Sequence, residues 1–270
     1  TDLATLVMRM KENNPDRVIY LADARQSMHF IQVFRCARKT GIVPDTTELV
    51  HIGFGTMNGK DGKPFKTRDG GVMRLEYLLK EIDDEMLNKI KENQKEKENL
   101  NIDEAEAEQT AKTVALAAVK YGDLSNQASK DYIFDIDRFT SFEGNTGPYI
   151  LYTIVRIKSI LSKYEAKGGD ISALKDAIMP AVNAGQKNLM LSLAKFNATI
   201  ESAYEESAPH KICAYIYELA NAFNGFYHDT KILSEENEEL KKSYISLLVL
   251  TKEILEACID MLGFSAPDRM

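Results

Sequence analysis

Two short apolar runs on either side of a helical segment constrain the fold of this chain more than any other feature. The first run, VIYLA (18–22), is short and β-branched, as in a buried strand, and the second, ELVHIGFG (48–55), ends in glycines. Between them, HFIQVFRCARKTG (29–41) has apolar residues at helical spacing. A strand, a helix and a second strand in this order predict a βαβ unit of a parallel sheet.

The rest of the chain has the pattern of helices. A helix over 2–12 precedes the βαβ unit and ends at Asn13-Asn14-Pro15. Further helical patterns follow the second strand at 73–92, 103–121, 149–165, 171–203, 209–229 and 236–262. The last four are amphipathic and predict a helix bundle. The expected fold class is therefore mostly α with an α/β part, and a hydrophobic content of 44% is enough for a packed core.

The charge of the chain is unevenly distributed. The net charge of −7 is concentrated in residues 81–108, which hold eleven acidic side chains and four lysines. In the remaining residues the positive and negative charges are equal in number. A nucleic-acid partner is therefore not excluded by the acidic total. No apolar run approaches the roughly 20 residues that cross a bilayer, so no membrane partner is expected. The scattered cysteines fit neither a disulfide framework nor a metal site, which favours a cytoplasmic protein without a metal centre.

A loop rich in lysine and glycine, GKDGKPFKTR (59–68), follows the second strand at its carboxyl end. Ligands of open α/β sheets bind at that end. Its cations lie near glycines that allow close approach of the backbone, and this suits a polyphosphate. There is no match to the P-loop pattern. A solvated turn with ordinary lysines explains the same spacing about equally well, so the residues alone leave both interpretations open.

The segment LVHIGFGTMNGKDGKPFKTRDGGVMRL (49–75) resembles the second signature region of arginyl-tRNA synthetases. In that comparison KPFKT (63–67) stands where other class I synthetases carry K-M-S-K-S, although Pro64-Phe65 replaces Met-Ser. The resemblance implies that Lys63 and Lys66 are catalytic cations. They would grip the phosphates of ATP, which binds with Mg²⁺, and stabilise charge on the departing pyrophosphate.

Two other segments, TDLA (1–4) and DARQSMHFIQVF (23–34), resemble the arginine pocket of the same family. The resemblance implies that Asp2 and Gln26 hold the cationic groups of L-arginine, a role that suits a carboxylate and an amide. It also suggests that His29 lies beside the adenosine of ATP. Without the resemblance, Asp2 is an ordinary helix N-terminal residue, Gln26 a loop residue and His29 a helix cap.

The segment FDIDRFTSFEGNTGPYILYTIVRIKSIL (134–161) is similar to the junction between the catalytic body and the anticodon-binding domain of the family. Tyr149, Tyr152 and Arg156 are spaced to lie along one side of its helix, and such a face suits unstacked bases. We expect Tyr149 at the RNA surface and Tyr152 partly buried. Core tyrosines with outward polar tips are the alternative.

The match continues through APHKICAYIYELANAFNGFYHD (208–229) and GFSAPDRM (263–270). Helical spacing places most aromatic residues of the first segment in the core: Tyr215, Tyr217, Phe223, Phe226 and Tyr227. Because the extreme C-terminus of the family lies near the anticodon loop, the resemblance makes Tyr217 and Met270 further candidates for tRNA contact, beside Tyr149 and Arg156.

The resemblance covers the whole chain and implies three parts: a C-terminal piece of a class I Rossmann-type catalytic domain (1–72), a helical connecting region against the tRNA stem (73–139), and an all-α anticodon-binding domain (140–270). The implied parent is a monomeric arginine–tRNA ligase that uses ATP, L-arginine and arginine tRNA. We expect the acidic residues 81–108 to face solvent, away from the RNA.

The sequence HIGF (51–54) is not the other class I signature, H-I-G-H. Its fourth residue is Phe54, it lies on a predicted strand, and it stands too close to KPFKT. That signature is expected upstream, so this chain alone should not form arginyl-adenylate. Two alternatives remain: a noncatalytic tRNA-binding module, and an α/β nucleotide-binding scaffold with a helical protein-interaction domain. The presence of Asp2, Gln26 and KPFKT favours the enzyme.

Overall fold

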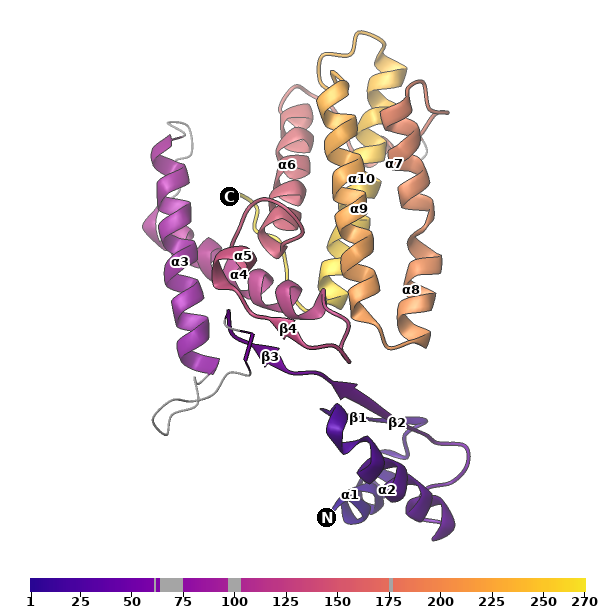
Figure 1. Ribbon diagram of the computed structural model, residues 1–270. Helices are drawn as coiled ribbons and strands as arrows, with labels where there is room; N and C mark the ends of the chain where they lie inside the picture. Colours follow the sequence, from indigo (N-terminus) through magenta and orange to yellow (C-terminus); the bar gives the residue numbers. More distant parts are fainter. Residues whose placement is uncertain (61, 64–74, 97–102, 175–176) are drawn as a thin grey trace. The chain divides into compact units, whose positions relative to one another are not determined.

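A computed structural model describes the chain except for residues 61, 64–74, 97–102 and 175–176. The chain divides into two compact units. The small unit comprises residues 1–66 and 126–134, and the large unit comprises residues 67–125 and 135–270. Figure 1 shows the elements of each.

The small unit is built on a two-stranded parallel sheet. Its elements are α1 (Asp2–Asn13), β1 (Arg17–Asp23), the 3₁₀ turn η1 (Ala24–Gln26), α2 (Ser27–Lys39), β2 (Glu48–Phe54), β3 (Met57–Asn58) and β4 (Tyr132–Ile133). β1 pairs with β2 in parallel, from Arg17 opposite Glu48 to Asp23 opposite Phe54. The predicted βαβ unit is therefore confirmed. Its core cluster is small: Leu6, Val18, Ala37 and Val43 are buried, partly buried apolar side chains pack against them, and Phe30 is buried as well.

A second parallel pair joins β3 to β4 and brings residues 126–134 into the small unit. The amide of Gly55 donates to the Ala128 carbonyl at 2.8 Å. A side chain at Gly55 would meet the backbone of Lys130 at 2.4 Å, so only glycine fits there. The expectation that every element after the lysine and glycine loop is helical is wrong at β4. A pair of two-residue strands is too short to leave an alternating pattern in the sequence.

The described secondary-structure elements of the large unit are all helices or helical turns. Its elements are α3 (Leu75–Glu96), α4 (Glu104–Leu124), α5 (Ile136–Phe139), α6 (Gly147–Glu165), the 3₁₀ turn η3 (Ser172–Leu174), α7 (Ala184–Ala194), α8 (Phe196–Glu205), α9 (Pro209–Asp229) and α10 (Glu238–Met261). Helices α6, α7, α9 and α10 lie side by side (Figure 1). The predicted bundle is thus confirmed.

The single helix predicted over 171–203 is wrong. The structure has η3, a non-helical stretch at residues 177–183, and then α7 and α8 as separate helices. Pro180 lies in the non-helical stretch, where it cannot donate a helical hydrogen bond. Asn183 then starts α7 by accepting from the Gln186 amide at 2.8 Å. Lys195 both ends α7 and precedes α8. Apolar spacing alone did not reveal these breaks.

Helix α4 is held tightly to the bundle. The buried hydroxyl of Tyr121 lies 2.5 Å from Asn145 Oδ1 and 2.9 Å from the carbonyl oxygen of Cys213 in α9. Burial raises the pKa of Tyr121 far above its usual range. A side chain at Gly147, at the start of α6, would lie 2.4 Å from the Ala117 carbonyl oxygen. These close approaches make α4 part of the same packed body as α6 and α9.

Within the described ranges, no helix is long and apolar enough to cross a membrane. All three cysteines are free thiols, half-buried at Cys36 and buried at Cys213 and Cys258.

Candidate functional site

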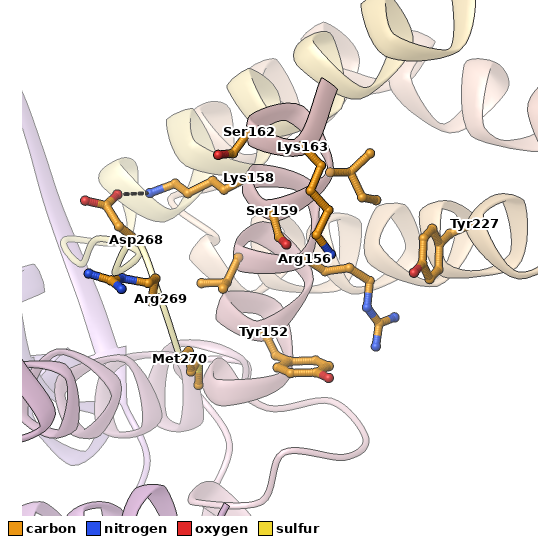
Figure 2. A pocket seen from close by; sticks show the side chains of 12 residues that line it. Tyr152, Arg156, Lys158, Ser159, Ser162, Lys163, Tyr227, Asp268, Arg269 and Met270 are labelled. Carbon is orange, nitrogen blue, oxygen red and sulfur yellow. Dashed lines mark hydrogen bonds and ion pairs between the residues drawn. The ribbon is translucent and has the colours of Figure 1, made fainter. Parts of the chain in front are cut away.

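A cavity of about 840 Å³ opens on one side of α6 in the large unit. Figure 2 shows its walls, which come from α6, from Tyr227 of α9 and from the last residues of the chain, Asp268 to Met270. Cavities of this size are typical of ligand sites in proteins. Four cationic side chains line it against one carboxylate, Asp268: Arg156, Lys158, Lys163 and Arg269. The site is therefore positive, although the whole chain carries −7.

Arg156 lies between two tyrosines in this cavity. Its guanidinium carbon is 4.8 Å from the ring centre of Tyr152 and 5.3 Å from that of Tyr227. Its Nη1 donates to Asn224 Oδ1 at 2.6 Å. A guanidinium over an aromatic face is held by cation–π attraction and keeps its polar edge for other partners. Arg156 and Met270, both predicted from sequence, thus line the same cavity.

Tyr149 on α6 and Tyr217 on α9 form a second pair of tyrosines, outside the residues that line the cavity. Their ring centres are 5.7 Å apart with an edge-to-face angle of 62°, and both side chains are half-buried. The hydroxyl of Tyr149 donates to Asn221 Oδ1 at 2.6 Å and accepts from Asn224 Nδ2 at 2.9 Å. Asn224 therefore connects the Tyr149–Tyr217 pair to Arg156. Tyr152 is half-buried, as expected.

The C-terminal tail forms one wall of the cavity and is tied down at several points. Lys158 Nζ lies 3.1 Å from Asp268 Oδ1, a contact drawn in Figure 2, and 3.3 Å from the Pro267 carbonyl oxygen. Lys158 Nζ is also 3.4 Å from Glu256 on α10. Lys120 binds the Gly263 carbonyl, and Arg269 pairs with Glu106 at 3.3 Å.

Sequence reasoning missed Tyr227 and Lys163. Tyr227 is not a core residue: 41% of it is exposed, whereas Phe223 and Phe226 are buried. Consecutive residues of a helix point about 100° apart, so Phe226 and Tyr227 cannot share the core direction. Lys163 follows Arg156 by seven residues, which is two turns along the same face of α6. That spacing was a usable signal.

The small unit brings two predicted residues together. Asp2 Oδ2, in the first turn of α1, lies 3.0 Å from His29 Nε2 on α2. Gln26 precedes α2 and is exposed, one turn before His29. His29 is thus not the helix cap. The neighbouring Arg25 donates to Asp23, and its hydrogen bonds lower the pKa of that carboxyl to about 2.

The lysine and glycine loop is described only in part. The Gly59 amide donates to the Lys63 carbonyl at 2.9 Å, which closes a turn, and Gly62 adopts the left-handed φ of 71° within it. Lys63 is exposed. Lys66 lies outside the described residues. The catalytic role of both lysines therefore stays a prediction.

His51 has a packing role. It lies on β2, as expected, and its ring stacks on that of Phe30 with centres 4.7 Å apart. The acidic side chains described within 81–108 are exposed or half-buried, on α3 and α4. Among the residues that the structure describes, no group of three His, Cys, Asp or Glu side chains could hold a metal ion.

Two family models match consecutive parts of the chain. The model of the catalytic domain of tRNA synthetases class I (R) matches residues 1–136, and that of the DALR anticodon binding domain matches residues 150–270. The arginine–tRNA ligase of Alkaliphilus oremlandii is 54% identical over 270 residues, which are 100% of this chain and 44% of that protein. That of Francisella tularensis subsp. tularensis is 44% identical over 272 residues, with 100% and 45% covered.

The chain is also similar to solved structures of arginyl-tRNA synthetases. The arginyl-tRNA synthetase of Plasmodium falciparum matches with a TM-score of 0.81 and 28% identity, over 100% of this chain and 44% of that one. The Thermus thermophilus arginyl-tRNA synthetase matches with a TM-score of 0.77 and 25% identity, over 94% and 41%. The chain thus spans less than half the length of these relatives.

Proposed function

We propose, because the chain belongs to the family of class I tRNA synthetases (R), that it is part of an arginine–tRNA ligase. Such an enzyme joins arginine to the α-phosphate of ATP with release of pyrophosphate, and then transfers it to the terminal adenosine of arginine tRNA. The observation that carries the proposal is the positive, tyrosine-lined cavity of the large unit, within the part that matches an anticodon-binding domain. A tRNA substrate and a cytoplasmic, monomeric enzyme follow from the same proposal.

The cavity has the chemistry that single-stranded RNA requires. Bases of an anticodon loop can stack on tyrosine faces and on a guanidinium plane, at about 1–3 kcal/mol per base. The lining cations attract the phosphates between those bases. In this proposal Tyr149, Arg156 and Tyr217 contact the bases, and Met270 contributes the apolar end of the tail wall.

The small unit contributes to arginine activation. Asp2 pairs with a cationic group of arginine and Gln26 adds a directional hydrogen bond. Because Asp2 Oδ2 already contacts His29, the arginine cation binds through Oδ1 or displaces the imidazole, which brings His29 near the reacting groups. Lys63 and Lys66 stabilise charge on the ATP phosphates. Mg²⁺ enters with ATP, since it is bound largely through phosphate oxygens and retained waters.

Filter binding tests the RNA part of the proposal. The full chain is titrated with arginine tRNA and with a transcript in which uracil replaces the central cytosine of the anticodon, at one stated salt concentration. We expect tighter binding of the first. Arg156→Lys keeps the charge but not the planar fork and should reduce this discrimination, whereas Lys187→Met, on α7, should not. Equal, salt-sensitive binding of both transcripts by the unaltered chain would contradict the proposal.

Arginine-dependent ATP–pyrophosphate exchange tests the catalytic part, in a protein that joins this chain to the remainder of a synthetase of its relatives' length. We expect Lys63→Ala and Lys66→Ala each to lower exchange by about 10²–10³-fold, the usual cost of removing a group that stabilises developing charge. Lys39→Ala, at the end of α2, is the matched control. Anticodon discrimination without any exchange would instead favour a noncatalytic tRNA-binding module.

A further inference from the structure

We infer that Asn224 is a positioning residue of the RNA site, because its one amide group holds both the Arg156 guanidinium and the Tyr149 hydroxyl. The inference rests on the proposed function and deepens it. Asn224 lies on α9, is half-buried, and is absent from the residues that line the cavity. It therefore acts through the two side chains that it binds.

Three contacts define the arrangement. Asn224 Oδ1 accepts from Arg156 Nη1 at 2.6 Å, and Nδ2 donates to the Tyr149 hydroxyl at 2.9 Å. Nδ2 also lies 3.4 Å from Thr153 Oγ1. All three partners belong to α6. The two tyrosine rings contact the guanidinium of Arg156 without a directional bond. The hydrogen bond to Asn224 adds that direction at Nη1.

The chemistry of arginine fixes the orientation of the Asn224 amide. The two ends of an asparagine amide are usually hard to tell apart. Here a guanidinium has only donors, so the oxygen of Asn224 must face Arg156 and its nitrogen must face Tyr149. The Tyr149 hydroxyl thus accepts from Asn224. In the orientation that the structure gives the Asn221 amide, the hydroxyl donates its proton to Asn221 Oδ1 at 2.6 Å.

This direction determines what the site can recognise. The proton of the Tyr149 hydroxyl is in use, so the hydroxyl can offer a further partner only a lone pair. The site therefore presents an acceptor at Tyr149 and donors at Arg156. A base edge that carries an amino group beside a ring acceptor, as in cytosine, complements this pair, whereas the keto group of uracil places an acceptor against an acceptor. Asn224 would thus support the preference for an amino-bearing base.

The test compares binding of the cytosine and uracil transcripts by the full chain and its variants. Asn224→Leu removes both hydrogen bonds at similar volume, and we expect the ratio of the two dissociation constants to fall about tenfold, a typical effect of losing a hydrogen bond to a charged group. Asn224→Asp still accepts from Arg156, so the variant should fold. It cannot donate to Tyr149, so the ratio of the two dissociation constants should fall in part. Asn197→Leu, the same change at an exposed position of α8, should leave the ratio unchanged.

A thermodynamic cycle separates positioning from a general structural role. If Asn224 acts through its partners, Asn224→Leu should change the ratio little in a chain that already carries Tyr149→Phe and Arg156→Ala. A further tenfold loss in that background, or full discrimination by both Asn224 variants, would overturn the inference alone. An unaltered chain that does not discriminate would overturn the proposed function, and this inference with it.

Discussion

The small unit has a compact core cluster of four buried residues with partly buried neighbours, whereas the large unit buries side chains along α6, α9 and α10. The small unit also leaves large apolar side chains of β1 in solvent: Leu21 is 67% exposed and Ile19 47%. A two-stranded sheet with one covered face is marginally stable by itself. The large unit therefore holds its candidate site in a preformed arrangement, while the candidate residues of the small unit lie on a less stable fold.

The candidate sites differ in the same way. In the large unit, Arg156 and Tyr149 are fixed by Asn224 and by aromatic neighbours before any ligand binds. In the small unit the contact between Asp2 and His29 joins side chains that are 36% and 51% exposed. Binding at the first site should therefore cost little side-chain entropy, and binding at the second site should cost more.

Thiol reactivity should show the largest contrast. Burial raises the pKa of Cys213 and of Cys258 to about 12, and the reactive form is the thiolate. At pH 8 we therefore expect one thiol, Cys36, to react quickly with an aromatic disulfide reagent, and the other two only after the bundle unfolds. Intact mass against time measures this. Cys36→Ser should abolish the fast reaction, and fast labelling of two thiols would contradict the burial of the large unit.

Core substitutions should separate the two units in a melting experiment. We expect two calorimetric transitions, with the small unit unfolding first. Phe223→Ala should destabilise the large unit by about 3–5 kcal/mol, and Leu6→Ala the small unit by about 2–5 kcal/mol, because each empties a fully buried site. Each variant should lower the midpoint temperature of the transition of its own unit and leave that of the other unit unchanged. A single transition that both variants lower equally would show that the units unfold together.

Two glycines of the large unit should respond in opposite directions to alanine. Gly147→Ala forces a methyl group against the Ala117 carbonyl and should cost about 1–3 kcal/mol. Gly225 in α9 has no neighbour within 4 Å of an added Cβ, so Gly225→Ala should stabilise the helix by about 0.5–1 kcal/mol. Urea unfolding measures both. A neutral Gly147→Ala would mean that α6 and α4 can move apart.

The tail contacts should give the smallest effect. Lys158→Met removes the ion pairs with Asp268 and Glu256, which together are worth at most about 1 kcal/mol because the Asp268 side chain is 95% exposed. The expected result is faster removal of the last residues by a carboxypeptidase, with the melting temperature nearly unchanged. Lys163→Met, on the same helix, is the matched control and should leave the digestion rate as it is.

Local patterns predicted much of this architecture because the features concerned are local. The βαβ unit followed from apolar runs, and α9 was predicted at its observed bounds, Pro209–Asp229. Tyr152 and Arg156 were placed on one face because four residues make about one helical turn. The break in the helix near Pro180 was not predicted, because the apolar spacing on both sides continues through it.

Features that join distant parts of the chain left no local pattern. Asn224 and Tyr227 contact Arg156 from another helix. Lys158 contacts Asp268 in the C-terminal tail, more than a hundred residues away in the sequence. Nothing in a helical repeat tells which face of α9 meets α6. The roles assigned to Asp2, Gln26, His29, Lys63 and Lys66, and the three-part division of the chain, came from family resemblance and stay predictions.

The close fit of α4 to the bundle bears on how such a protein can be recombined. The matched catalytic model runs through residue 136 and so includes α4, yet α4 packs against α6 and α9 through Gly147 and the Tyr121 hydroxyl. A chimera joined at that sequence boundary would strip the bundle of its neighbour and leave the Cys213 carbonyl without its tyrosine. The bundle that can be transplanted is therefore larger than the region matched by the DALR model, and a graft of it should include α3 and α4.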